Sequence, residues 1–293
     1  MYYIRFFIGT LFNDEIEVLF LMNVYNVCND YKEFGNYNAL IERITKGTRL
    51  TGTREWACTN LNCALGCAND CRYCYARVEA LRRKRIITFD DWKFMKPLPA
   101  VLKNFRHVDH ATMFPSTHDI IPSNETYSLV LEIIKSQLQA ANKLLITSKP
   151  RIKAIRDIID IAESFKKDLI VFRFTITTLD EDLAKWIEPG SPSISERLES
   201  AKFAFEKGFK VTFSIEPCLE NPVKLIDQIS RYSDEIWLGV MNRVYLRWLK
   251  HKIDPRIIEH FNKINAEITR DVLEISCKQK VFIKDTLASL LLG

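Results

Sequence analysis

Residues 66–75 read Gly66-Cys67-Ala68-Asn69-Asp70-Cys71-Arg72-Tyr73-Cys74-Tyr75. This short loop carries three cysteines in the spacing CxxxCxxC. Three thiolates on one tight loop can each bind one iron of a cubane [4Fe–4S] cluster. The fourth iron is then left without a protein ligand, and an open metal position distinguishes a reacting site from a structural one. We therefore expect Cys67, Cys71 and Cys74 to hold a cluster with one open iron.

A structural zinc site is the alternative for these cysteines. Cys63 lies four residues before Cys67, so that the four thiolates of Cys63, Cys67, Cys71 and Cys74 could surround one ion. Structural zinc usually joins two CxxC pairs across a spacer, and the sequence has no second pair. Further cysteines stand alone, and an isolated free cysteine is usually a small buried core residue; these are Cys58, Cys218 and Cys277. The spacing favours the cluster over zinc.

Length and composition are those of a globular enzyme. The chain has 293 residues, of which 47% are hydrophobic, and single α/β barrels commonly fill this length. Eight cysteines are too few for a disulfide-dense secreted scaffold, and a thiolate-bound cluster needs a reducing compartment, so we expect a cytoplasmic location. Charges interrupt the apolar stretches of Met1–Met22, which predict neither a membrane-spanning helix nor a signal sequence. No GxGxxG or phosphate-binding lysine motif occurs.

Short apolar runs alternate with helical patterns after the cysteine loop, as is typical of parallel βα units. We expect strands near residues 60–63, 110–116, 144–148, 169–176, 210–216, 235–240 and 281–283. A capping box at Ser193 and Glu196 opens a helix that Gly208 ends, and Asp254-Pro255 begins a longer one. About six βα units are predicted, in one α/β domain that spans residues 54–293, with residues 1–53 as an N-terminal extension.

Polar residues follow most of these predicted strands. They lie in Ser116–Asp119, Ser148-Lys149, Thr175–Thr178, Glu216-Pro217 and Met241–Arg243. A parallel barrel carries its chemistry at the carboxyl ends of its strands. A single polar residue there is as often a helix cap or a solvated turn. Together with the cysteine loop, however, so many polar strand ends predict a functional site at this edge of the sheet.

The sequence from about Arg54 to Asn242 resembles the radical S-adenosylmethionine (SAM) enzymes, in the branch that contains spore photoproduct lyase. The matching segments are residues 66–77, 113–119, 146–149, 177–181, 188–190 and 192–198. The resemblance implies a partial (β/α)6 barrel and a SAM-binding [4Fe–4S] cluster. It also implies reductive cleavage of SAM to a 5′-deoxyadenosyl radical that abstracts hydrogen from a substrate. The substrate, and the choice between a lyase and a transferase reaction, are not implied.

Two positions depart from that branch. Asn69 stands where many relatives have a histidine, at a position that is not a cluster ligand. Ser116 stands where spore photoproduct lyase is expected to use a hydrogen-donating cysteine, and an O–H bond is too strong to replace a thiol in that step. The Gly-Gly-Glu stretch that often holds the SAM amine is also absent. That contact is therefore expected from groups around Ser116 and Asp119.

Matching positions imply roles for the remaining site residues. Lys149 and Thr175 lie where relatives bind the SAM carboxylate and ribose, and a lysine at a strand end suits a carboxylate. Tyr73 would pack beside the adenine. Glu216 is a candidate for binding ribose or a substrate group, so that Ser116 and Glu216 are the catalytic candidates. For Glu216, a buried structural pair with an arginine is nearly as good an interpretation.

The expected partners are an electron donor of the flavodoxin or ferredoxin type and a substrate. The basic run Arg82-Arg83-Lys84-Arg85 follows the cysteine loop closely, with Arg77 before it. Such runs are typical of nucleic-acid-binding patches when they share a face, although most are solvated helix faces. A nucleic acid is therefore one candidate substrate, and no membrane partner is expected. The alternative function is a non-catalytic zinc- or cluster-binding protein that binds nucleic acid.

Overall fold

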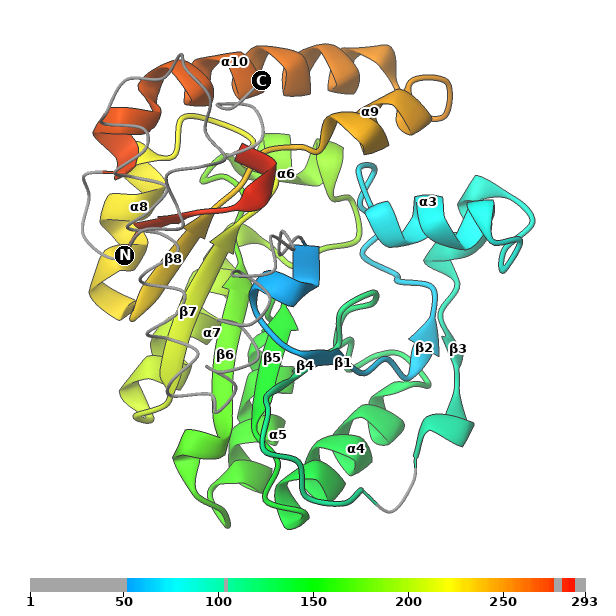
Figure 1. Ribbon diagram of the computed structural model, residues 1–293, viewed down its shortest axis with the longest axis vertical. Coiled ribbons are helices and arrows are strands. Elements are labelled where there is room, and N and C mark those ends of the chain that lie inside the picture. The colour runs from blue at the N-terminus through cyan, green and yellow to red at the C-terminus, as the bar shows by residue number, and fades with distance from the viewer. Residues whose placement is uncertain (1–51, 103–104, 277–280, 288–293) are drawn as a thin grey trace, which may run out of the picture.

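A seven-stranded parallel sheet organises the described part of the chain (Figure 1). The computed structural model describes residues 52–102, 105–276 and 281–287. The sheet order is β1-β4-β5-β6-β7-β8-β9, and every neighbouring pair is parallel. The strands are β1 (Thr59–Asn60), β4 (Thr112–Phe114), β5 (Leu144–Ser148), β6 (Ile170–Thr175), β7 (Lys210–Ile215), β8 (Glu235–Leu238) and β9 (Val281–Ile283).

The crossovers between these strands are mainly helical, which confirms the predicted α/β fold of a partial barrel with repeated βα units. The α-helices are α3 (Tyr75–Arg82), α4 (Tyr127–Gln139), α5 (Ile152–Ala162), α6 (Glu181–Ile187), α7 (Ile194–Glu206), α8 (Val223–Ile229), α9 (Arg243–Leu249) and α10 (Pro255–Ser276). Short 3-10 helices are η2 (Gly52–Glu55), η3 (Phe89–Lys93), η4 (Pro99–Val101), η5 (Lys167–Leu169) and η6 (Ser230–Tyr232). The predicted N-terminal extension falls almost wholly on residues 1–51, outside the described residues.

The core lies between the sheet and the helices of one face. On β6, Phe172 and Phe174 point to this side and pack with Ile155, Ile158 and Ile159 of α5. Successive strand residues point to opposite faces, and Val171 accordingly packs on the other face with Met113, Leu145 and Trp56. Apolar clusters cover both faces of the central strands, which explains why the sequences of these strands are continuous apolar runs.

The predicted helix starts at Ser193 and Asp254 are confirmed. The Ser193 side chain accepts a hydrogen bond from the backbone N–H of Glu196 at 3.1 Å. Glu196 does not complete the box, because its carboxylate accepts from the backbone N–H of Ile152 instead. Gly208 follows α7 with φ +79°, a conformation that favours glycine. Asp254 accepts from the N–H of Arg256 at the start of α10.

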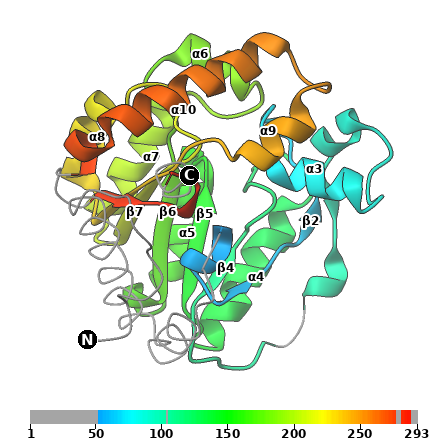
Figure 2. The same ribbon diagram turned by 45° about the horizontal axis from the view of Figure 1, so that its top comes forward.

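A second, antiparallel pair holds the cysteine loop beside the main sheet. It joins β2 (Ala64–Leu65) to β3 (Lys96–Pro97), and the sequence patterns did not predict it. Figures 1 and 2 show α3, α6 and α9 at the end of the sheet where the strands finish. None of the described helices is both long and apolar enough to cross a membrane.

Candidate functional site

The cysteine loop connects β2 to α3 and is shaped by its backbone. Gly66 has φ +101°, and a Cβ there would lie 2.5 Å from the carbonyl oxygen of Phe94, so only glycine fits. The N–H of Cys67 donates to the Trp92 carbonyl at 2.7 Å, and the N–H of Cys74 donates to the Cys71 carbonyl at 3.2 Å. Cys74 is the N-cap of α3. The loop therefore presents its three thiols from a tight, hydrogen-bonded turn.

The three thiols are free and lie near one another. Cys67 and Cys71 are each 8% exposed, and Cys74 is half-buried. Burial raises the pKa of Cys67 well above its usual value, and the charges of Asp119, Cys71 and Cys74 add to this effect. Burial also raises the pKa of Cys71 to about 11, although Lys149 opposes it. Metal binding would replace these protons.

Three cysteines on one loop match the number of irons that a cubane cluster binds through protein thiolates when one iron stays open. Among the described residues, no three His, Cys, Asp or Glu side chains converge on a point that one metal ion could occupy. A cubane needs no such point, because each iron stands at its own corner with its own cysteine. Cys63 is completely buried and turned elsewhere: its Sγ lies 3.7 Å from Nε2 of His118, which also accepts the Cys63 N–H. The four-thiolate zinc arrangement is therefore not what the geometry favours.

The connection from α6 to α7 packs directly against the cysteine loop. The N–H of Gly190 donates to the Asn69 carbonyl at 3.0 Å, and the N–H of Arg72 donates to the Ile187 carbonyl at 3.0 Å. A Cβ at Gly190 would lie 2.0 Å from the carbonyl oxygen of Ala68, so no side chain fits there. These backbone contacts hold the cysteine loop in place against the end of α6 and the connection that follows it.

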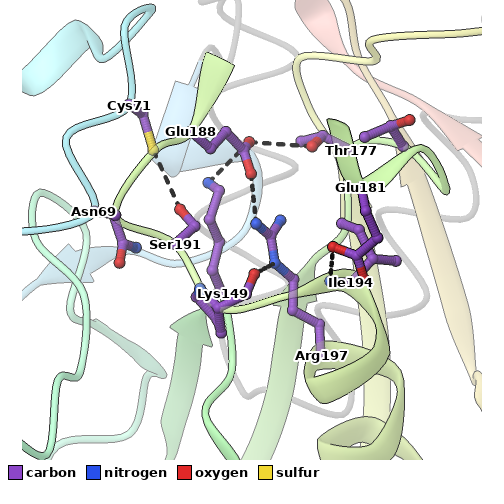
Figure 3. Close-up of polar contacts among 12 residues, drawn as sticks. Asn69, Cys71, Lys149, Thr177, Glu181, Glu188, Ser191, Ile194 and Arg197 are labelled. Carbon is purple, nitrogen blue, oxygen red and sulfur yellow. Dashed lines mark hydrogen bonds and ion pairs between the residues drawn. The ribbon is translucent and has the colours of Figure 1, made fainter. Parts of the chain in front are cut away.

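Glu188 is the centre of a buried ionic network behind the loop (Figure 3). Its carboxylate accepts hydrogen bonds from Tyr73 and, at 3.1 Å, from Thr177. It also pairs with Arg197 at 2.7 Å and with Lys149 at 3.6 Å. Burial alone would raise the pKa of Glu188, but the Lys149 and Arg197 charges outweigh it and hold that pKa at about 2. Glu188 is thus a buried anion with two cations.

Cys71 is held by the same network. Its Sγ contacts Oγ of Ser191 (Figure 3), and the two atoms are 3.8 Å apart. Lys149 is largely buried, and its ammonium lies 5.5 Å from the centre of the Tyr73 ring. Although burial opposes its charge, the charges of Cys71 and Glu188 raise the pKa of Lys149. Lys149 is therefore a firmly charged cation next to the cysteine loop.

Asp119 lies beside the cysteine loop, and its carboxylate already accepts several hydrogen bonds from the protein. Both oxygens accept side-chain hydrogen bonds, one from Asn69 and the other from Ser148, and the backbone N–H groups of Ile120 and Lys149 also donate. Arg151 extends this network by donating to Asn69 at 2.6 Å. The structure therefore gives Asp119 the role of fixing Asn69 and the start of the Lys149 segment, and its predicted contact with SAM stays a prediction.

Tyr73 points inward rather than toward an open site. It is 8% exposed, its hydroxyl bonds to Glu188, and its ring packs edge-on against Phe261 at 6.0 Å. Its predicted place beside the adenine of SAM stays a prediction. Thr175 ends β6 half-buried and, by strand alternation, shares the face of Val171. Its predicted contact with SAM stays a prediction, like that of Lys149.

Ser116 lies just beyond β4 and is linked to the first residue of α3. Its carbonyl accepts from the Tyr75 hydroxyl at 2.6 Å. Asn62 donates to its hydroxyl at 2.9 Å and accepts its N–H at 2.8 Å. Ser116 is thus hydrogen-bonded to the side chain of the residue that follows Cys74, and its predicted catalytic role stays a prediction. Sequence patterns gave no signal for Asn62.

Glu216 forms an ion pair with a lysine, whereas the sequence leaves a structural pair with an arginine as one of two interpretations. Nζ of Lys284 lies 2.8 Å from one carboxylate oxygen, and Thr286 donates to the other at 2.9 Å. The same lysine pairs with Glu55 at 3.1 Å. The partner follows β9, at the far edge of the sheet order, where no local pattern indicates it. Binding of ribose or substrate by Glu216 stays a prediction.

The basic run after α3 is exposed, but Arg77 is not part of it. Arg77 is 3% exposed and forms ion pairs with Asp70 at 2.7 Å and Asp90 at 3.2 Å. Arg82, Arg83, Lys84 and Arg85 are all exposed. The exposed patch is therefore shorter in sequence than predicted.

Sequence reasoning missed the roles of Glu188 and Arg197. One signal was present for Arg197: it falls at helical spacing with Ile194, Ala201 and Ala204, on the buried stripe of α7. A charged residue on an apolar stripe needs a buried partner. The identity of that partner depends on the tertiary fold.

Comparison with known proteins finds two sequence relatives, and both are uncharacterised. No family model matches the sequence. An uncharacterised protein of Acidianus two-tailed virus is 25% identical over 85% of this chain and 94% of its own length. An uncharacterised protein of Methanocaldococcus jannaschii is 25% identical over 70% of this chain and 78% of its own.

Among solved structures, spore photoproduct lyase has the same fold. A variant of that enzyme with a dinucleoside spore photoproduct aligns with a TM-score of 0.51 and 15% identity, over 76% of this chain and 75% of that chain. Another variant, with bound AdoMet and the dinucleoside spore photoproduct, aligns with a TM-score of 0.51 and 14% identity. At this level of identity, the likeness shows that the two proteins share a fold.

Proposed function

We propose that this chain is a radical SAM enzyme in which Cys67, Cys71 and Cys74 hold a [4Fe–4S] cluster. The observation that carries the proposal is that three free thiols lie on one short loop, while the fourth candidate thiol, Cys63, contacts His118. When bound, such a cluster would supply the electron for reductive cleavage of SAM, which would yield a 5′-deoxyadenosyl radical able to abstract hydrogen from a substrate. A flavodoxin or ferredoxin type protein is the proposed electron donor.

The protein's own groups would bind and orient SAM. Lys149 offers a charged ammonium for the SAM carboxylate, and Glu188 with Arg197 fixes where that ammonium lies. Thr175 offers a hydroxyl at the next strand end for the ribose. Asp119 acts through Asn69 and the Lys149 backbone, and Ser116 and Glu216 are left as candidates for contact with the substrate. Ser116 does not supply a thiol hydrogen, so reversal of a thymine photoproduct by that route is not proposed.

Anaerobic reconstitution of single cysteine variants tests the proposal. Cys71→Ala should lose bound iron, the visible absorption of the cluster and dithionite-dependent release of 5′-deoxyadenosine together. The matched control is Cys63→Ala, which also removes a buried thiol but should keep all three, because the iron that binds SAM needs no fourth cysteine. Equal iron loss in both variants, or a colourless zinc protein without SAM cleavage, would overturn the cluster assignment in favour of a structural metal site.

A further inference from the structure

The positive charge of the molecule is concentrated in two segments that lie side by side. Residues 72–98 and 243–256 together contain thirteen Lys and Arg against four Asp and Glu, whereas the whole chain has 42 against 37. The rest of the chain is therefore net acidic. The first segment contains α3 and the second contains α9, and the two helices are neighbours in both ribbon views (Figures 1 and 2). Such asymmetry is typical of a surface that binds a polyanion.

Exposed aromatic and apolar side chains collect on the same two segments. Six large hydrophobic side chains are exposed among the described residues, and only Phe205 lies elsewhere; the others are Tyr75, Ile87, Phe94, Leu98 and Trp248. Trp248 of α9 is 45% exposed, and the Arg82 guanidinium lies 4.9 Å from its ring centre. Glu79 also pairs with that guanidinium, at 2.6 Å. An aromatic face flanked by cations is what an unpaired base stacks on.

This surface begins at the cysteine loop. Tyr75 follows Cys74 directly, is 38% exposed and packs against Tyr245 of α9 at 6.0 Å between ring centres. A chain that follows the surface from Trp248 to Tyr75 therefore ends beside the three thiols. A duplex would keep its base faces stacked inside the helix and could not use these rings, whereas a single strand can place bases on the rings and phosphates on the lysines and arginines.

We propose that the α3–α9 surface, formed by Tyr75, Arg82–Arg85, Arg247, Trp248 and Lys250, binds single-stranded nucleic acid. The binding itself is independent of SAM chemistry. That the bound strand is also the substrate rests on the proposed function. Arg85 and Lys250 are exposed cations that follow the C-terminal ends of α3 and α9 and serve as phosphate contacts, while Trp248 serves as the stacking platform.

Fluorescence anisotropy with labelled (dT)20, (rU)20 and a 20-base-pair DNA duplex tests this proposal on the full chain without SAM or reductant. Both single strands should bind more tightly than the duplex at low salt. Trp248→Leu should weaken single-strand binding about tenfold, the effect of losing one stacked base, whereas Phe205→Leu, the matched exposed aromatic on α7, should not. Arg85→Gln with Lys250→Gln should lower the slope of log affinity against log salt by roughly 1.4, or about 0.7 for each phosphate contact.

The controls separate this proposal from the cluster assignment. Cys71→Ala should lose iron yet bind (dT)20 as the unchanged chain does, so that failure of one proposal leaves the other standing. Circular dichroism checks that Trp248→Leu is folded, and Trp248→Phe should retain most of the binding because it keeps an aromatic face. Equal binding of duplex and single strands that Trp248→Leu leaves unchanged, or no binding preference over polyglutamate, would overturn the proposal and leave a solvated face or a protein-docking surface.

Discussion

Glu188 and Glu55 are both buried carboxyl groups, yet the structure gives them opposite charge states. Glu188 has two cations, Lys149 and Arg197, which lower its pKa to about 2 despite its burial. Glu55 shares its only paired cation in the described structure, Lys284, with Glu216. Burial therefore dominates and raises the pKa of Glu55 to about 8, with Lys284 opposing only in part. The ratio of cations to carboxylates decides which group stays ionised.

The difference in charge between Glu188 and Glu55 corresponds to two different structural roles. The ionised Glu188 lies behind the cysteine loop, where it fixes Lys149 next to Cys71. The largely neutral Glu55 joins the residues before β1 to those after β9, because its carboxyl accepts the N–H of Asp285 at 2.9 Å. An anion that orients a cation must stay charged, whereas a carboxyl group that links two chain segments needs only hydrogen bonds.

Removing one cation from Glu188 should have the largest effect. Arg197→Met leaves Glu188 buried with only Lys149 and the hydrogen bonds from Tyr73 and Thr177. We expect a loss of about 3 kcal/mol in the free energy of unfolding, at the lower end of the cost of breaking a buried ion pair. Urea denaturation at pH 7 measures this loss.

The matched control for Arg197→Met is Lys202→Met on the same helix. Lys202 pairs with Glu206 at 3.7 Å on the surface, and an exposed pair contributes at most about 1 kcal/mol. The double variant Lys149→Met/Arg197→Met should lose more than Arg197→Met alone, because the buried Glu188 carboxylate is then left without a cation. If Arg197→Met costs no more than Lys202→Met, Glu188 is not held as an anion by Arg197.

The two carboxyl groups should also give opposite pH dependences. The ordinary glutamate pKa is 4.5. The lowered pKa of Glu188 gives stability that is present above pH 4.5 and is lost as the pH falls toward 2. The raised pKa of Glu55 gives stability that is present below pH 4.5 and is lost as the pH rises through 8. Of these two carboxyl groups, Glu55 is the one expected to titrate near neutral pH.

Glu55→Gln tests this assignment. The variant should gain stability relative to the unchanged chain as the pH rises from 5 to 8, by up to about 1.4 kcal/mol per pH unit. Urea denaturation at several pH values measures the difference, and Glu163→Gln, at an exposed pair with Lys207, is the control. A difference that stays flat with pH would show that Glu55 is ionised in the folded chain and that the contrast with Glu188 does not hold.

Local patterns were enough to predict the sheet and part of the site. The apolar run of residues 169–176 predicted β6, Ser193 predicted the start of α7, and CxxxCxxC with its preceding glycine predicted the loop. Each of these signals lies within about ten residues, which is the range over which periodicity and turn chemistry act.

The rest of the site depends on contacts between distant segments. Glu188 draws its partners from the cysteine loop, from the end of β5 and from α7, and no local pattern links Tyr73, Lys149 and Arg197. For Glu216 the sequence offered an arginine only as an alternative partner, and the cation that the fold supplies is Lys284. Helix α9 is short and mixed in polarity, so its place beside α3 also follows from the tertiary fold alone.

The smallest expected effect concerns how α7 presents Arg197 to Glu188. Ser193 caps this helix through one hydrogen bond to the N–H of Glu196, whereas Glu181 covers the N–H groups of Ile194 and Ser195. Ser193→Ala should therefore cost about 1 kcal/mol, the usual value for one lost N-cap bond, with no change in the pH dependence below pH 4.5 that Glu188 supplies. Thermal unfolding at pH 7 and at pH 3 measures both quantities. A loss as large as that of Arg197→Met would mean that the cap, rather than the ion pair, fixes the position of α7, and the contrast between the two carboxyl groups would then rest on helix placement instead of on the number of cations.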